Sequence, residues 1–273
     1  MLVHEIDWTR RLQAGASTIL LVVVAIVLVA APAEARKCRK DAVQVGDACI
    51  DSYEASAWEL LDPGDKSTAK GFEKGKFKSA DALTGRAVQR GVSSDDYGAA
   101  CPDDGSDCTN LYAASIPGVK PSTLITWFQA LVACRNAGKR LATNQEWQAA
   151  ALGVPNGDNG VNTCNTDNLG PGVLATGARE FCVSDVGAYD MVGNVWEWVA
   201  DWVPSSTACP GWGSFSDDLM CLSGASTTEQ GPGALIRGGF FNFGSFAGPL
   251  AVNGSVVPSV SSNGIGFRCA RDQ

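Results

Sequence analysis

The stretch YDMVGNVWEWVADW, residues 189–202, combines a glycine-containing turn with three tryptophans. Large aromatic side chains bury much apolar area, so we expect Trp196, Trp198 and Trp202 to fill a hydrophobic core. The carboxylates of Asp190 and Glu197 flank the turn. Local capping or pairing is one role open to Glu197.

Two helices are expected on the amino-terminal side of this stretch. The first covers Ser122–Asn136, with Ser122 as its cap, an apolar face, and Gly138 as its stop. The second begins at Thr143, where TNQE places Glu146 three residues after a threonine and so predicts a capping box. It should end before Gly153.

The first part of the exported chain reads as strands and loops. Residues 43–58 predict a strand pair that turns at Gly46 and Asp47. Residues 62–110 are polar and rich in glycine and lysine, which predicts a long surface insertion. Its Lys-rich run, Lys66 to Lys78, is interpreted as a solvated loop. Short apolar segments separated by glycines predict further strands and turns as far as Cys269.

The amino terminus has the pattern of an export signal. Arg10 and Arg11 precede an apolar run from Ile19 to Ala31, and residues 33–35 offer a small-x-small cleavage site. We therefore divide the chain into a signal peptide or membrane anchor, 1–35, and a single domain, 36–273. The protein is expected to be exported to the periplasm, the cell surface or the medium, and to contact a membrane only if the segment stays uncleaved.

The cysteine count and the charge limit the possible functions. Ten cysteines, an even number in an exported chain, predict disulfides and not metal ligands. Closeness in sequence favours the pairs Cys38–Cys49, Cys101–Cys108 and Cys164–Cys182. The other four cysteines are Cys134, Cys209, Cys221 and Cys269. A formal charge of −8 argues against a nucleic-acid partner. Cleavage would remove His4, the only histidine.

Four motifs occur in order: ACRNAGKRLATNQEW at 133–147, YDMVGNVWEWVADW at 189–202, LIRGG at 235–239 and GIGFRCARD at 264–272. Together they resemble the formylglycine-generating enzyme, or sulfatase-modifying factor, family. The resemblance implies an α+β, C-type-lectin-like fold with few helices, small twisted sheets and much irregular chain. It also implies a Cys134–Cys269 disulfide. The Ca²⁺ ligands that it implies are Asp190, Gly193, Val195 and Glu197, the two middle residues acting through their carbonyls. Hard oxygen ligands on a glycine-containing turn suit Ca²⁺. The alternative is that Glu197 caps or pairs locally.

The resemblance does not carry the family's chemistry with it. In the catalytic branch two cysteines bind copper, and the matching positions here are Phe243 and Gly248, which cannot ligate a metal. A second branch uses histidine-bound iron, and the mature chain would have no histidine. We therefore expect no catalytic residue and no copper, haem or nucleotide. The alternative is a divergent formylglycine-generating-type enzyme that acts on protein substrates.

The final segment, 237–268, resembles instead the variable proteins of diversity-generating retroelements. In that branch the codons of a terminal segment are rewritten at adenines from a template rich in AAC, which cannot produce Lys, Glu, Gln, Met or Trp. Residues 238–267 contain none of these five. The segment also lacks any charged side chain between Arg237 and Arg268. Such a segment suits surface complementarity better than chemistry.

This resemblance implies a non-catalytic protein that binds a protein or a cell-surface ligand through a diversified surface. Exposed phenylalanines next to Asn and Ser would act as anchors with adaptable polar neighbours. The Phe-Phe-x-Phe run cannot place all its rings on one face of a regular strand, so at least one ring should be exposed or in a loop. The candidate ligand-binding residues are Phe240, Asn242, Phe243, Phe246, Asn253, Ser255, Val256, Val260, Ser262 and Gly264.

Overall fold

A computed structural model describes residues 37–155, 163–167, 172–204 and 232–273. Within these ranges the α-helices are α1 (Lys66–Glu73), α2 (Trp127–Asn136) and α3 (Asn144–Ala150). The strands are β1 (Ala42–Val45), β2 (Ala48–Asp51), β3 (Ala55–Leu60), β4 (Ala87–Arg90), β5 (Leu111–Ser115), β6 (Arg140–Leu141), β7 (Trp196–Pro204), β8 (Pro232–Arg237), β9 (Val252–Val256), β10 (Ile265–Phe267) and β11 (Cys269–Asp272). The short 3₁₀ turns are η1 (Ala80–Leu83), η2 (Gly98–Ala100) and η4 (Gly244–Phe246). This composition confirms the expected α+β class.

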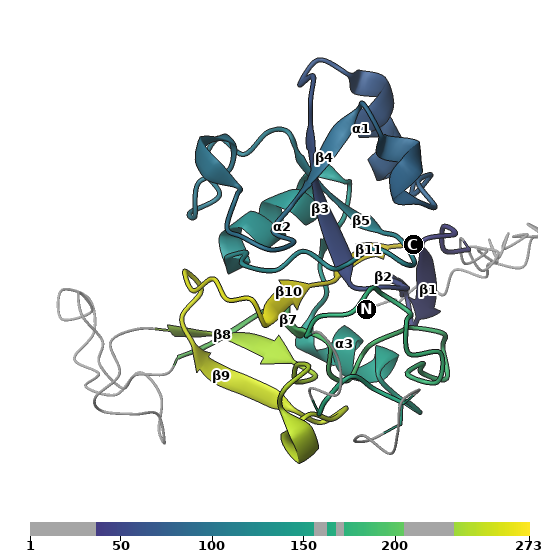
Figure 1. The fold of residues 1–273 in the computed structure, drawn as a ribbon. Helices are drawn as coiled ribbons and strands as arrows, with labels where there is room; N and C mark the ends of the chain where they lie inside the picture. Colours follow the sequence, from purple (N-terminus) through teal and green to yellow (C-terminus); the bar gives the residue numbers. More distant parts are fainter. Residues whose placement is uncertain (1–36, 156–162, 168–171, 205–231) are drawn as a thin grey trace, which may run out of the picture. The chain divides into compact units, whose positions relative to one another are not determined.

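The described strands form three small sheets, ordered β1-β2-β11-β6, β10-β7-β8-β9 and β4-β3-β5 (Figure 1). The last strand, β11, lies between β2 and β6, so the carboxyl end closes onto the first strands of the described chain. Strand β10 pairs in parallel with β7, placing Phe267 opposite Trp198. The motif at 264–272 therefore joins two of the sheets.

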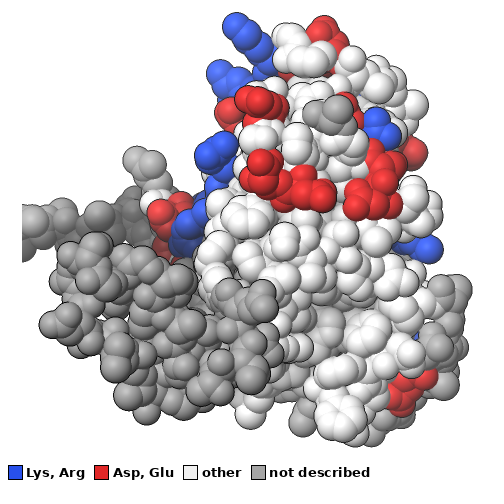
Figure 2. All heavy atoms as spheres, turned by 90° about the vertical axis from the view of Figure 1, so that its left-hand side faces the viewer, with Lys and Arg blue, Asp and Glu red and all other residues white. Residues whose placement is uncertain are grey.

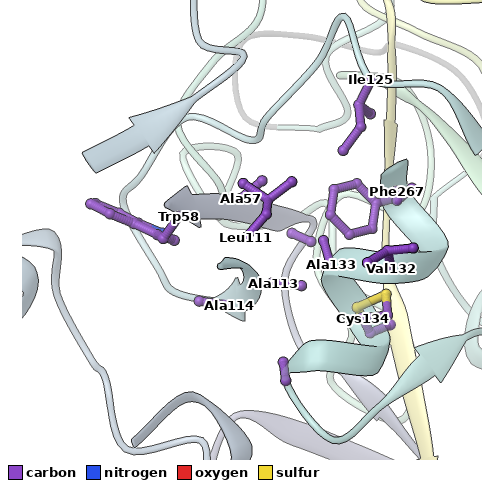
Figure 3. Close-up of a cluster of buried hydrophobic side chains, with 14 of the residues drawn as sticks. Ala57, Trp58, Leu111, Ala113, Ala114, Ile125, Val132, Ala133, Cys134 and Phe267 are labelled. Carbon is purple, nitrogen blue, oxygen red and sulfur yellow. A yellow bond between two sulfur atoms is a disulfide. The ribbon is translucent and has the colours of Figure 1, made fainter. Parts of the chain in front are cut away.

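Several aromatic residues of the four motifs lie in the hydrophobic core. Trp147, Trp198 and Phe267 are fully buried. Figure 3 shows Phe267 in a cluster with Ile125, Val132 and Ala133, next to the Cys134 disulfide. Trp196 is also buried, but Trp202 is 40% exposed, so its expected core role is wrong. The Trp202 ring packs edge-on against Trp127 at the surface instead.

The helix predictions had different outcomes. The capping box of α3 is confirmed, because Thr143 accepts from the Glu146 amide and Glu146 accepts from the Thr143 amide. The predicted start of the earlier helix is wrong: α2 is capped by Thr126, which forms a capping box with Gln129. Ser122 instead uses its hydroxyl to join the Ala57 amide to the Arg90 carbonyl, between β3 and β4.

The loop interpretation of the Lys-rich run is wrong for its first half, which is helix α1, capped by Asp65. Strand β4 pairs with β3, and Phe72, Leu83 and Tyr97 are buried. Residues 62–110 therefore hold part of the core as well as polar surface. The turn at Gly46 and Asp47 between β1 and β2 is as predicted.

Four disulfides join the described cysteines: Cys38–Cys49, Cys101–Cys108, Cys134–Cys269 and Cys164–Cys182. All four predicted pairs are confirmed. Cys209 and Cys221 lie outside the described residues, as does the predicted signal segment. Within the described ranges, no helix has the length and apolar character needed to cross a membrane.

Candidate ligand-binding surface

The candidate surface begins where β8 ends. Gly238 and Gly239 follow Arg237 with φ angles of 92° and 89°, which side chains other than glycine rarely adopt. A Cβ on Gly239 would collide with Ala247, and one on Gly238 would meet the Met191 carbonyl oxygen at 2.8 Å. The two glycines thus let the chain leave the sheet in close contact with its surroundings.

Backbone hydrogen bonds hold the loop after these glycines in place. The Phe241 amide donates to the Asn194 carbonyl at 3.0 Å, and the Phe243 amide donates to the Thr166 carbonyl at 2.9 Å. The Arg237 guanidinium stacks on the Trp147 ring at 4.6 Å and donates to the Pro249 carbonyl at 3.2 Å. Backbone hydrogen bonds to Asn194 and Thr166 therefore hold this loop in place.

Later in the segment the backbone is tied down in the same way. The Trp127 amide donates to the Pro258 carbonyl at 3.0 Å, and the Leu124 amide donates to the Ser262 carbonyl at 2.9 Å. Strand β9 pairs with β8 and places Asn253 opposite Ile236. The segment is thus anchored at spaced points to the sheet β10-β7-β8-β9, to Leu124 before α2 and to Trp127 at the start of α2.

The phenylalanines form a connected aromatic cluster in irregular chain. Ring centroids of Phe240 and Phe243 lie 5.5 Å apart, and those of Phe243 and Phe246 lie 5.6 Å apart. Phe243 also meets the buried Trp196 ring edge-on at 5.1 Å. Phe246 is 77% exposed, whereas Phe240 and Phe243 are half-buried. The cluster thus leads from the core to an exposed ring.

The ten predicted contact residues are not equally available. Three are exposed: Asn242, Phe246 and Ser255. Six are half-buried: Phe240, Phe243, Asn253, Val256, Val260 and Ser262. Gly264 is buried, and a Cβ there would lie 2.9 Å from the Phe240 ring. Gly264 therefore cannot present a side chain to a ligand, and we remove it from the surface.

Three exposed apolar residues of the segment were missed. Leu250, Val252 and Val257 are 76%, 50% and 43% exposed. Apolar residues are usually assigned to the core from sequence, so the pattern gave no signal at Leu250. Figure 2 shows that the lower part of this side of the molecule, which holds β8 and β9 in Figure 1, carries few Lys, Arg, Asp or Glu residues. The surface is thus apolar and almost uncharged.

A pocket of about 200 Å³ borders this surface. Phe241 and Asn263 from the segment line it together with Ser93, Lys120 and Leu124 from the preceding part of the chain. Leu124 has a φ of 54°, an uncommon value for a bulky residue. The pocket places one cation, Lys120, at the edge of an otherwise uncharged area.

The predicted Ca²⁺ ligands are brought together, but Glu197 is already engaged. Its Oε1 accepts from Arg268 Nη2 at 2.7 Å, and its Oε2 accepts from Arg268 Nε at 2.9 Å and from the Trp147 indole at 2.8 Å. The Arg268 guanidinium thus binds both oxygens of the carboxylate that a metal ion would need as a ligand. Local pairing of Glu197, the alternative considered from sequence, describes what the structure shows.

The other predicted metal ligands lie on the same turn. Asp190 is buried and accepts from the Gly177 amide at 2.6 Å. Burial raises the pKa of Asp190 to about 7, so this carboxyl is largely neutral in mildly acidic solution. Gly193 and Val195 are buried beside it. No group of three or more His, Cys, Asp or Glu side chains suited to a metal occurs within the described parts of the chain. The arrangement does not fit a Ca²⁺ site built on Glu197.

A buried acid, Glu54, which was not predicted from the sequence, supports the turn. Glu54 accepts from the Asn194 amide group at 2.6 Å and from the Val195 backbone amide at 3.2 Å. Burial raises the pKa of Glu54 well above its ordinary value, and the neighbouring Asp190 and Glu197 raise it further. The same Asn194 anchors Phe241, so this acid is linked to the candidate surface through one residue.

A family model, the sulfatase-modifying factor enzyme 1-like domain, matches residues 55–273. The chain belongs to this family. Among curated members, it is 29% identical over 178 residues to the formylglycine-generating enzyme of Streptomyces coelicolor, covering 56% of this chain and 52% of that protein. It is 28% identical over 167 residues to the inactive C-alpha-formylglycine-generating enzyme 2 of Bos taurus, covering 55% and 50%. The chain therefore spans about half the length of the curated relatives that it matches.

Among solved structures, the M1 variant of the major tropism determinant is one of the matches. It shares 20% sequence identity, covers 85% of this chain and 52% of its own, and has a TM-score of 0.46. Phe243 and Gly248, the positions that the family resemblance led us to compare with the copper-binding cysteines, both make contacts within the fold. Phe243 belongs to the aromatic cluster, and the Gly248 amide donates to the Gly238 carbonyl at 3.1 Å.

Proposed function

We propose that this protein is an exported, non-catalytic binding protein that presents residues 237–268 to a protein or cell-surface ligand on a sulfatase-modifying factor scaffold. The observation that carries the proposal is that the backbone and the side chains of this segment have different roles. Its backbone is fixed by Asn194, Thr166, Trp127 and Leu124, whereas its side chains include large exposed apolar groups. Side chains on such a backbone can change without loss of the fold.

The chemistry of the surface supports recognition more than catalysis. Catalysis by general acids, bases or nucleophiles needs a proton-carrying side chain at the reacting centre. Residues 238–267 contain no ionisable side chain. Exposed aromatic and aliphatic side chains beside Asn and Ser are the composition of binding surfaces in which a few anchors supply most of the affinity.

The diversified origin of the segment is tested in the DNA that surrounds the coding sequence. We expect a reverse-transcriptase gene nearby and a second copy of the stretch that encodes residues 237–268, differing from it only at adenines. A genome with neither feature would remove the proposed mechanism of diversification. It would leave a fixed binding surface to be tested separately.

The binding capacity is tested with a displayed library. Positions 242, 246, 250, 252, 255 and 257 would be randomised together and the library selected on one purified globular protein, such as serum albumin. We expect binders whose melting temperature stays within a few degrees of the parent. A matched library at six exposed positions on and beside α1, namely 62, 66, 67, 70, 73 and 74, serves as the control for nonspecific enrichment. A folded library that yields no more binders than this control contradicts the proposal.

A further inference from the structure

A second group of buried charges lies away from the candidate surface, around the sheet β1-β2-β11-β6. Asp41 precedes β1, Asp51 ends β2, Lys139 precedes β6 and Arg271 lies in β11. Their side chains are 3%, 0%, 0% and 8% exposed. Charged residues are almost never this deeply buried unless they are fully paired.

The centre of the group is the Lys139 amine. Its Nζ lies 2.5 Å from Asp51 Oδ1 and 3.0 Å from Asp41 Oδ2. Asp41 Oδ2 also accepts from Arg271 Nη2 at 3.2 Å. The second oxygens, Asp41 Oδ1 and Asp51 Oδ2, have no hydrogen-bond partner within the described structure. As an ion-pair network the group is therefore incompletely satisfied, although buried carboxylates normally have all their oxygens bonded.

The two carboxyl groups are driven toward different protonation states. Burial raises the pKa of Asp51 by more than the adjacent Lys139 lowers it. Burial acts in the same sense on Asp41, but the positive charges of Lys139 and Arg271 hold the pKa of Asp41 below its ordinary value. Two nearby carboxyls whose pKa values are pushed apart are suited to separate acid and base roles. Burial therefore favours the protonated form of Asp51, whereas the two cations favour the ionised form of Asp41.

We propose that Lys139 and Asp51 condense to an intramolecular amide bond, with Asp41 as the group that transfers the proton. A proton first passes from Lys139 Nζ to the contacting Asp51 Oδ1, the Nζ lone pair then attacks Cγ of Asp51, and Asp41 accepts a second proton from the nitrogen. The C–O bond to the Asp51 hydroxyl then breaks, and the proton on Asp41 leaves with that oxygen as water. One C–N bond forms, one C–O bond breaks and one water is released, so no oxidant or cofactor is needed.

The site has the features that this condensation requires. The amine and carboxyl are in contact, which replaces an encounter between two molecules and gives a high effective concentration. A cavity of about 10 Å³, lined by Asp41, Phe72 and Phe77 among others, lies next to the proton-transferring group. It is about the size of one water molecule, so it can receive the product. The absence of bulk water also protects the amide from hydrolysis.

The bond would join β2 to the chain just before β6, which are 88 residues apart in sequence. It would act beside the Cys134–Cys269 disulfide, which joins α2 to β11. Unlike that disulfide, it would resist reducing agents.

The test is the mass of the full-length, folded protein after complete reduction of its disulfides. We expect a mass lower than that of the linear chain by one water, and after proteolysis a branched peptide that joins the segments carrying Asp51 and Lys139. The reduced protein should also migrate faster in a denaturing gel than a linear chain of equal length. Separate linear peptides for these two segments in the wild type would overturn the proposal.

Two variants locate the chemistry. Asp41→Asn removes the proton-transferring carboxylate at nearly constant size, and we expect a folded protein with unlinked peptides. Asp51→Asn should still react, but with loss of ammonia in place of water, so the branched peptide would have the same mass as in the wild type. A fully linked Asp41→Asn protein would overturn the role of Asp41. If either variant fails to fold, the wild-type peptide map alone decides whether the bond exists.

Discussion

Truncation of Phe246 and of Phe267 should have opposite consequences for folding, although both are phenylalanines of the final segment. Phe267 is fully buried between α2 and the neighbourhood of β7, so Phe267→Ala removes a whole core ring. Such changes typically destabilise by about 3–5 kcal/mol. Phe246 is 77% exposed, and about a quarter of its surface is lost to burial, so Phe246→Ala should destabilise by about 1 kcal/mol or less.

These energies convert into separable melting temperatures. For a chain of this size each kcal/mol shifts the midpoint by about 2–4 °C. We therefore expect Phe267→Ala to melt roughly 6–20 °C below wild type and Phe246→Ala within about 4 °C of it. Differential scanning calorimetry at neutral pH, with all variants oxidised, measures both. Equal losses for the two variants would refute the reasoning, because Phe246 would then be a core residue and not an exposed anchor.

Gly264 supplies a third variant within the same segment. A Cβ at this position would lie 2.9 Å from the Phe240 ring, so Gly264→Asn overpacks the loop and should destabilise by about 1–3 kcal/mol. Ser255→Tyr, at an exposed position of β9, is the matched control and should leave the midpoint nearly unchanged. A Gly264→Asn protein as stable as Ser255→Tyr would return Gly264 to the set of variable residues.

Three further results are expected. A chelator should leave the melting temperature unchanged, because Glu197 is paired with Arg268; a lower midpoint that Ca²⁺ restores would re-establish the predicted metal site. Because the pKa of Asp190 is raised to about 7 by burial, the folded state binds its proton more tightly than the unfolded state. Stability should therefore fall as the pH rises from about 4 to 7, and Asp190→Asn should flatten this dependence in the presence of chelator; parallel curves for the two proteins would contradict it. The denatured, unreduced protein should show no reactive thiol, whereas two would indicate that Cys209 and Cys221 are unpaired.

Local signals were sufficient for several elements of the fold. The Thr143–Glu146 capping box and the Gly46–Asp47 turn each depend on residues a few positions apart, and both were predicted correctly. The start of α2 was not, because Ser122 and Thr126 are both good caps. Contacts of Ser122 with β3 and β4, distant in sequence, decide between them.

Helix α1 was missed although the signal was present. Asp65 is a good cap, and Phe72 is the apolar residue that the helix buries against Phe77 and Tyr112. Because lysines surround this single aromatic residue, the stretch was interpreted as a solvated loop. A helix with one buried aromatic residue depends on tertiary contacts more than on an apolar stripe.

The candidate surface was predicted as a segment but not residue by residue. Strand β9 changes register against β8 between Ala234 and Ile236, and this irregularity decides which of its side chains face solvent. Alternation along the sequence alone could not place Val252 outward or Val256 partly inward. The burial of Gly264 likewise follows from the position of the Phe240 ring, which no local pattern specifies.

The absence of charge between Arg237 and Arg268 has a kinetic consequence. Charged partners accelerate association by long-range attraction, and that acceleration weakens as salt is added. A surface without fixed charges offers no such steering, so association should proceed at about 10⁵–10⁶ M⁻¹s⁻¹ and change little with ionic strength. Differences among variants of the surface would then lie almost entirely in how long each complex lasts. Variants that keep this segment uncharged would therefore differ in residence time while they search for their partner at about the same rate.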